Sequence, residues 1–127
     1  MAKTILKNGK VVNEGKIQEL DILLEGEQIV KIAASISDRH AKVIDVAGKY
    51  ILPGIIDDQV HFREPGLTHK GTIATESRAA VGGGITTFME QPNTIPQATT
   101  IEKLEQKFTT ASQSSFANYS FPFGGTN

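Results

Sequence analysis

The chain has 127 residues and a formal net charge of −1, so it carries no basic field that would favour nucleic acid or an anionic membrane surface as a partner. It contains no cysteine, which excludes disulfides and cysteine-ligated zinc. No apolar run approaches the roughly 20 residues of a membrane-spanning helix, and lysines interrupt the N-terminus where a signal peptide would need its apolar core. We therefore expect a cytoplasmic protein whose partner is a small molecule.

The first fifty residues predict a small sheet of short strands. The segments on either side of Asn8-Gly9 predict a hairpin, those on either side of Gly26 predict a second, and those around Gly48 repeat the pattern. Strands this short and closely spaced cannot bury both faces of a sheet by themselves. We therefore expect residues 1–52 to form a β-sandwich portion that packs against another part of the protein.

A different pattern begins at Pro53. The apolar periodicity predicts a strand from Ile55, a helix at 72–81, a strand at 85–89, a helix at 101–111 and a strand at 115–121. This alternation indicates an α/β fold with a parallel sheet and helical crossovers, either doubly wound or a barrel. Residues 53–127 are too few for an eight-stranded barrel of about 250 residues, so we expect the chain to be truncated.

Polar residues follow the first of these strands, where the sequence reads Asp-Asp-Gln-Val-His-Phe-Arg. If the strand continues, one of its faces carries Asp57, Gln59, His61 and Arg63. Buried polar groups without partners are costly, so this face must be solvated, hydrogen-bonded or wrapped around a ligand. His61 is then a ligand or an acid–base group, or else a histidine satisfied by a backbone carbonyl.

Four segments of the second half occur in a recognisable order: Pro53-Gly-Ile-Ile-Asp57, His61-Phe-Arg-Glu-Pro-Gly66, Gly83-Gly-Ile-Thr-Thr87 and Gln91-Pro-Asn-Thr94. Together they resemble the cyclic amidohydrolases of the amidohydrolase superfamily, and among these the dihydroorotases. The resemblance covers the whole chain as an N-terminal fragment. It implies a small β-sandwich portion at 1–52 and the first β/α units of a TIM (β/α)8 barrel at 53–127.

The resemblance also implies an activity and its residues. Dihydroorotases reversibly hydrolyse the cyclic amide of dihydroorotate to carbamoyl aspartate in pyrimidine biosynthesis, with one or two zinc ions. By similarity His61 binds metal, Arg63 binds the substrate carboxylate and Asn93 assists. A guanidinium meets a carboxylate with two parallel hydrogen bonds. Because relatives that open uncharged rings have no need of this, Arg63 favours dihydroorotase over dihydropyrimidinase and allantoinase. The alternative for Arg63 is a surface ion pair with Glu64.

Gln59 departs from the family pattern, since it stands where the first metal-binding histidine belongs. A neutral amide oxygen is a poorer zinc donor than imidazole. Gln59 could bind metal weakly, Asp57 or Asp58 could replace it, one metal could remain, or the metal could be lost. In the last case the protein would be a non-catalytic scaffold partner of aspartate transcarbamoylase. An active enzyme is favoured because the other motif residues are retained.

Several further expectations follow from the same resemblance. The catalytic aspartate and the other metal ligands lie further along the chain in the family, so we expect the 127 residues alone to be inactive and prone to aggregate. A homodimer is compatible with the resemblance. We expect His40 and His69 to be solvated, Thr68 to cap the first barrel helix, and Glu90 to support the site from behind.

Overall fold

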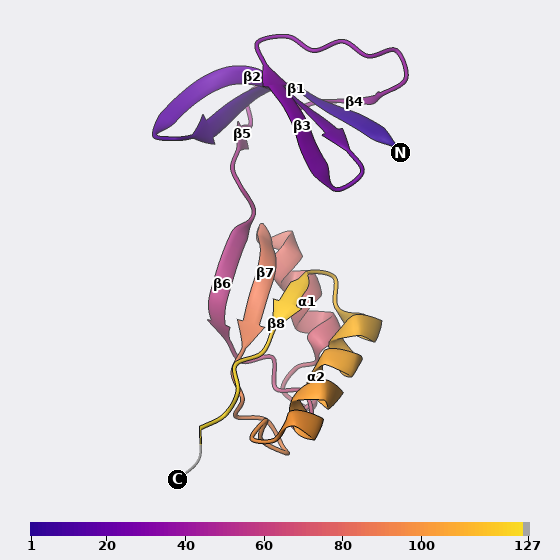
Figure 1. The fold of residues 1–127 in the computed structure, drawn as a ribbon. Helices are drawn as coiled ribbons and strands as arrows, with labels where there is room; N and C mark the ends of the chain where they lie inside the picture. The colour runs from indigo at the N-terminus through magenta and orange to yellow at the C-terminus, as the bar shows by residue number, and fades with distance from the viewer. Residues whose placement is uncertain (126–127) are drawn as a thin grey trace. The chain divides into compact units, whose positions relative to one another are not determined.

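The structure of the protein is a computed structural model that describes residues 1–125 (Figure 1). By its internal contacts the chain divides into two compact units, Met1–Pro53 and Gly54–Asn127. The first unit is built of strands, and the second alternates strands with helices. Within residues 1–125, no helix is both long and apolar enough to cross a membrane.

The first unit is a five-stranded sheet. Its strands are β1 (Lys3–Asn13), β2 (Lys16–Glu25), β3 (Gln28–Ala33), β4 (Lys42–Asp45) and β5 (Tyr50–Ile51). The order is β3-β2-β1-β4, with β5 also paired to β1. Strands β2 and β3 pair antiparallel on either side of Gly26, whose φ is 59°, which confirms the hairpin predicted there.

The other two predicted hairpins are wrong. Asn8 and Gly9 lie inside β1, where the register against β2 shifts between Leu6 and Gly9, so they mark a β-bulge instead of a turn. A side chain at Gly9 would collide with Ile51, whose Cδ1 would lie 2.2 Å from the added Cβ. The segments around Gly48 do not pair with each other either, because β4 and β5 each run parallel to β1.

Asp21 is the buried polar residue that joins several segments of this unit. Its carboxylate is 2% exposed and accepts the backbone N–H groups of Asn8 at 3.0 Å and Ile36 at 2.8 Å. The ammonium of Lys7 lies 3.2 Å from Oδ2. The hydrogen bonds from Asn8 and Ile36, helped by Lys7, lower the pKa of Asp21 below its ordinary value. One carboxylate therefore ties the bulge of β1 to β2 and to the segment after β3.

The replacement Asp21→Asn should lower the free energy of unfolding by about 2 kcal/mol, because an amide cannot accept from all three donors. The pKa of Asp21 is lower in the folded protein than in the unfolded chain. Its stabilisation is therefore complete above the unfolded pKa of about 3.9 and is lost as the pH falls through the folded pKa. Denaturant unfolding from about pH 6 to about pH 2 should show a shallower decline in the variant than in the wild type. Asp58→Asn, at an exposed residue, is the control; an identical acid profile for Asp21→Asn would contradict this role.

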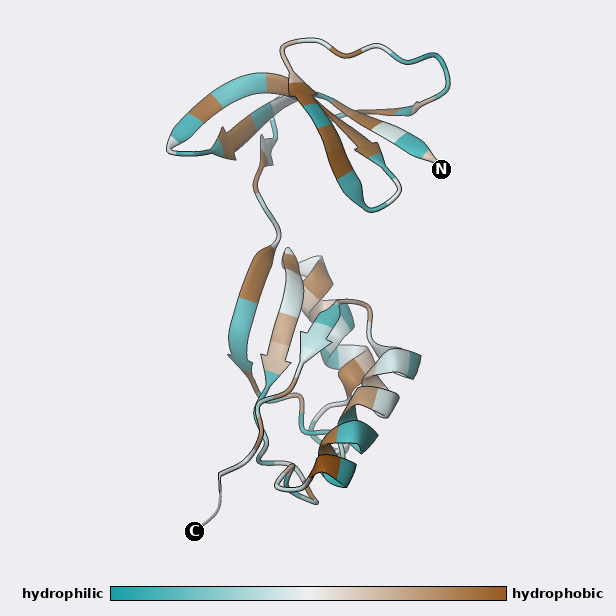
Figure 2. Cartoon of the chain, viewed as in Figure 1, coloured by the Kyte–Doolittle hydropathy of each residue, from teal (hydrophilic) through white to brown (hydrophobic). Residues whose placement is uncertain are grey.

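The second unit alternates strand and helix. Its elements are β6 (Ile55–Val60), α1 (Ile73–Gly82), β7 (Ile85–Glu90), α2 (Ile101–Ser114) and β8 (Asn118–Ser120). The strands are parallel in the order β6-β7-β8, which confirms the predicted α/β alternation with helical crossovers. The buried core comprises Phe62, Ile73, Phe88, Ala111 and Phe121. Strand β6 begins with two hydrophobic residues and turns hydrophilic at Asp57, Asp58 and Gln59 before its last residue, Val60 (Figure 2).

Helix α1 begins one turn later than the predicted cap. Thr72, and not Thr68, is the N-cap: its side chain accepts from the N–H of Thr75, and the side chain of Thr75 accepts from the N–H of Thr72. Thr68 lies in the turn that precedes this cap. The helix ends at Gly82, with Gly83 as the C-cap, as the glycine run predicts.

The helix at 101–111 is predicted from the spacing of Ile101, Leu104 and Phe108, and these three residues mark the buried face of α2 only in part. Ile101 is 67% exposed and Phe108 is also exposed, whereas Lys107 and Ala111 are the buried residues. Leu104 packs against the core as expected. The buried stripe is displaced because the lysine lies on it, and the reason is the partner that this lysine finds at the end of β7.

Candidate active site at the carboxyl ends of the parallel strands

His61 and Asn93 are brought together by the parallel sheet. His61 follows β6 and Asn93 follows β7, and the carboxyl ends of neighbouring parallel strands lie at the same edge. The two exposed side chains are hydrogen-bonded, with Nδ1 of His61 3.1 Å from Oδ1 of Asn93. An amide oxygen only accepts, so the ring carries a proton on Nδ1. In the neutral ring this leaves Nε2 as the atom with a lone pair.

The predicted alternation of side chains continues past the end of β6 and then stops. Val60 and Phe62 pack in or against the core, while Gln59 and His61 are exposed. Asp58, on the opposite side of the predicted strand from Asp57 and Gln59, is exposed as well. At Arg63 the backbone leaves the extended conformation, so the four polar residues do not form one continuous strand face.

Arg63 adopts a backbone conformation that favours glycine. Its φ is 74°, in the left-handed region, where a residue with a side chain costs about 1 kcal/mol or more. Its N–H donates to Oε1 of Glu90 at 2.7 Å, and its carbonyl accepts from the N–H of Leu67 at 3.0 Å. These two hydrogen bonds hold Arg63 in a conformation that its own sterics disfavour.

Glu64 has a structural partner other than Arg63. Its Oε2 accepts the N–H of Ile73, the first residue of α1, at 2.7 Å. A carboxylate at a helix N-terminus satisfies a free backbone donor and interacts favourably with the helix dipole. No ion pair joins Arg63 to Glu64 within residues 1–125, so the surface ion pair considered from the sequence is not formed.

Glu90 and Lys107 form a buried ion pair behind Arg63. Each side chain is 1% exposed, and Nζ of Lys107 lies 3.0 Å from Oε2 of Glu90. The same ammonium donates to the carbonyl of Gln91 at 3.0 Å and lies 4.8 Å from the ring centroid of Phe121. Burial raises the pKa of Glu90 and lowers the pKa of Lys107, and their mutual attraction opposes both shifts.

Sequence reasoning missed the role of Lys107. The signal was present, because Lys107 stands at the i+3 position from Leu104 and four residues before Ala111, on the apolar stripe of α2. A lysine on a buried helix face requires a partner. The expectation that Glu90 supports the site is consistent with its hydrogen bond to Arg63, but the sequence does not indicate that α2 supplies the counter-charge.

The loops that carry these residues are bonded to one another. The N–H of Gln91 donates to Val60, and the N–H of Ile95 donates to Pro65, at 3.0 and 3.1 Å. Gly66 makes the close approach feasible: its φ is 84°, and a Cβ there would lie 2.0 Å from the carbonyl oxygen of Ile95. The loop after β6 is therefore held against the loop after β7.

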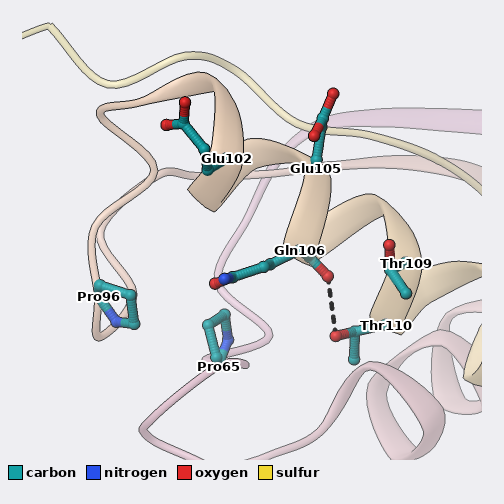
Figure 3. Close-up of a pocket in the computed structure, with 7 residues that line it drawn as sticks. All are labelled: Pro65, Pro96, Glu102, Glu105, Gln106, Thr109 and Thr110. Carbon is teal, nitrogen blue, oxygen red and sulfur yellow. Dashed lines mark hydrogen bonds between the residues drawn. The ribbon is translucent and has the colours of Figure 1, made fainter.

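The hollow drawn in Figure 3 lies beside these loops and is separate from the site residues. It is lined by Pro65, Pro96, Glu102, Glu105, Gln106, Thr109 and Thr110. The hydroxyl of Thr110 donates to the backbone carbonyl of Gln106, so this part of the wall is internally satisfied. Asn93 lines a different, smaller hollow together with Pro92, Gln97, Thr99, Gly124 and Gly125.

The described residues do not complete a metal centre. Within residues 1–125, no group of three His, Cys, Asp or Glu side chains lies close enough to hold a metal ion. Oδ1 of Asp57 accepts the backbone N–H of Gln59 at 3.2 Å, which is a local turn interaction. His61, Gln59 and Asp57 therefore all remain predictions as metal ligands.

Comparison with known proteins identifies the family. Residues 48–123 match the family model described as Dihydro-orotase-like. The chain belongs to the dihydroorotase-like family. The dihydroorotase of Streptococcus pyogenes is 42% identical over 111 residues, which cover 86% of this chain and 26% of that protein. The dihydroorotase of Carboxydothermus hydrogenoformans is 46% identical over 94 residues, which cover 72% of this chain and 22% of that protein.

Solved structures of cyclic amidohydrolases share the fold of this dihydroorotase-like chain. The L-hydantoinase (dihydropyrimidinase) of Arthrobacter aurescens superposes with a TM-score of 0.92 at 34% identity, covering 99% of this chain and 28% of that one. A D-hydantoinase (dihydropyrimidinase) of a Thermus species has a TM-score of 0.78 at 32% identity, covering 94% and 27%. The chain spans about a quarter of the length of these relatives.

The close contact at Gly66 yields a stability prediction. Gly66→Ala should lower the free energy of unfolding by at least about 2 kcal/mol, because the methyl group requires both a strained φ and separation of the two loops. Gly82→Ala is the matched control, since nothing lies within 4 Å of the added Cβ and its φ is not positive. Denaturant unfolding of both variants checks this, and equal stabilities would contradict the loop contact.

Proposed function

We propose that the full-length protein is a dihydroorotase, which reversibly hydrolyses the cyclic amide of dihydroorotate to carbamoyl aspartate. The observation that carries the proposal is the hydrogen bond between His61 and Asn93 at the carboxyl edge of the parallel sheet, in the loop after β6 that also carries Arg63. Relatives named dihydroorotase at 42–46% identity support it. The likeness to hydantoinases supports the broader class, hydrolysis of cyclic amides.

Each of the three residues has a role that its surroundings favour. Arg63 binds the carboxylate on the substrate ring, because a guanidinium offers two parallel donors to it. Asn93 accepts from His61 through Oδ1, which leaves its amide NH2 free to donate to the same carboxylate. The hydrogen bond from Nδ1 orients the His61 ring and presents Nε2 as a metal ligand or an acid–base group.

The larger architecture and the cofactor belong to the same proposal. Residues 1–52 would form a β-sandwich portion, and 53–127 would be the first β/α units of a TIM barrel whose remaining strands lie outside the described residues. One or two zinc ions would be held by His61 and by ligands further along the chain. Because the described residues do not complete that site, the steps assigned to this chain are substrate binding and orientation.

Hydrolysis of an uncharged cyclic amide is a second candidate. The TM-score of 0.92 with an L-hydantoinase (dihydropyrimidinase) favours it. The two candidates differ in the substrate carboxylate, which only dihydroorotate carries. Arg63 is therefore the residue that separates them.

The replacement Arg63→Met in the full-length protein should raise KM for dihydroorotate about 100-fold, because the bidentate partner of the carboxylate is lost. The residual rate with dihydrouracil, the same ring without the carboxylate, should not change. Steady-state kinetics with both substrates check this, and Arg78→Met, on the exposed surface of α1, is the control. Equal losses on both substrates would favour the second candidate.

Metal content distinguishes an enzyme from a scaffold. His61→Ala should abolish turnover and reduce the zinc bound per full-length chain, whereas Gln59→His should tighten zinc binding by about tenfold or more, because imidazole is a better ligand than an amide oxygen. Elemental analysis and competition with a chelator measure both effects. A wild-type protein without stoichiometric metal that co-purifies with aspartate transcarbamoylase would instead support the scaffold alternative.

A further inference from the structure

The core of the second unit does not need a buried ion pair at Glu90 and Lys107. Two charged side chains, each 1% exposed, lose their hydration in return for one contact at 3.0 Å. Replacing such a buried pair by apolar residues of similar volume is often neutral or stabilising. Packing alone therefore does not account for a carboxylate at the end of β7. An apolar residue at position 90, however, could not accept the N–H of Arg63.

We propose that the Glu90–Lys107 pair is a positioning device that holds the backbone of Arg63 in its left-handed conformation and so directs the guanidinium to the substrate carboxylate. This inference rests on the proposed function, in which Arg63 binds that carboxylate. Glu90 and Lys107 are positioning residues, since their side chains act through Arg63.

The geometry divides the two oxygens of Glu90 between two tasks. Oε2 lies against the ammonium of Lys107, and Oε1 accepts the N–H of Arg63 at 2.7 Å. The ammonium is itself held by the carbonyl of Gln91 and the ring of Phe121. The carboxylate therefore cannot rotate freely, and Oε1 stays in place for Arg63. Helix α2 and strand β7 together set the backbone of a residue in the loop after β6.

The conformation of Arg63 determines where its side chain leaves the chain. Phe62 lies two residues past the end of β6 and is buried in the core, so an extended residue after it would continue the direction of the strand. With φ at 74° the direction of the Cα–Cβ bond changes relative to the strand. If the hydrogen bond from its N–H is lost, the left-handed conformation loses a support, and the guanidinium spends less time at the carboxylate. The expected consequence is weaker substrate binding with chemistry preserved.

Two double variants of the full-length enzyme test this directly. Glu90→Met with Lys107→Met removes both charges and the acceptor, whereas Glu90→Gln with Lys107→Met removes both charges and keeps an acceptor oxygen. The Met–Met variant should raise KM for dihydroorotate about tenfold with little change in kcat, and the Gln–Met variant should restore most of the loss. The residual rate with dihydrouracil should be the same in both double variants as in the wild type. Ile22→Val, a buried substitution in the first unit, controls for reduced stability.

The outcomes separate this inference from the proposed function. Wild-type KM in the Met–Met variant, or an equal rise in KM in both double variants, would overturn the positioning role even if Arg63→Met shows its own large effect. If Arg63→Met leaves KM unchanged, the proposed function fails and this inference fails with it. Should the Met–Met variant not fold, amide hydrogen exchange in the unmodified protein decides: the Arg63 amide should be strongly protected, and rapid exchange would overturn the proposal.

Discussion

A carboxylate at the end of β7 cannot be left alone in the core, and the organisation of the second unit follows from how it is satisfied. Glu90 pairs through Oε2 with Lys107 of α2, and its Oε1 accepts a hydrogen bond from the backbone N–H of Arg63. Both contacts reduce the free-energy cost of burying the carboxylate, because an unpaired buried charge is strongly unfavourable. This single requirement explains why a lysine lies on the inner face of α2, and why the chain turns into a left-handed conformation just after the core residue Phe62.

The remaining site geometry comes from the parallel sheet. Parallel pairing of β6 with β7 places the residues that follow these strands at the same edge, where His61 and Asn93 meet. Backbone hydrogen bonds between the two loops, together with the close approach at Gly66, hold this edge together. His61 and Asn93 are exposed and Arg63 is half-buried, whereas Glu90 and Lys107 are buried. This division suits a site that must be rigid behind and open in front.

Membership of the dihydroorotase-like family places the chain among enzymes that share a framework and differ in their substrates. The fold is common to hydantoinases and to this chain at 32–34% identity, so the fold does not select the ring that is opened. The selection must come from individual side chains. In the proposed function Arg63 selects a ring with a carboxylate, and Gln59 sets this chain apart from the two-histidine pattern of the resemblance. Fold and chemistry are thus decided by different residues.

Local patterns identified the strands and helices of the second unit but only one of the three hairpins predicted for the first. Apolar periodicity and glycine positions identify the strands and helices after Pro53, and the motif around His61 identifies the polar strand end, because these signals act within a few residues. The bulge at Asn8-Gly9 resembles a turn in sequence, and only the pairing of β1 with β2 and β5 distinguishes the two. Likewise, the amino-acid sequence marks Lys107 as a cation among apolar residues, but a partner 17 positions away in β7 can be recognised only when the chain is folded.

Residue types, helical and strand periods and motif order are properties of the sequence itself. Which buried charge meets which, and which backbone conformation Arg63 must adopt, are decided by tertiary contacts, because the cost of desolvation exists only in the folded protein.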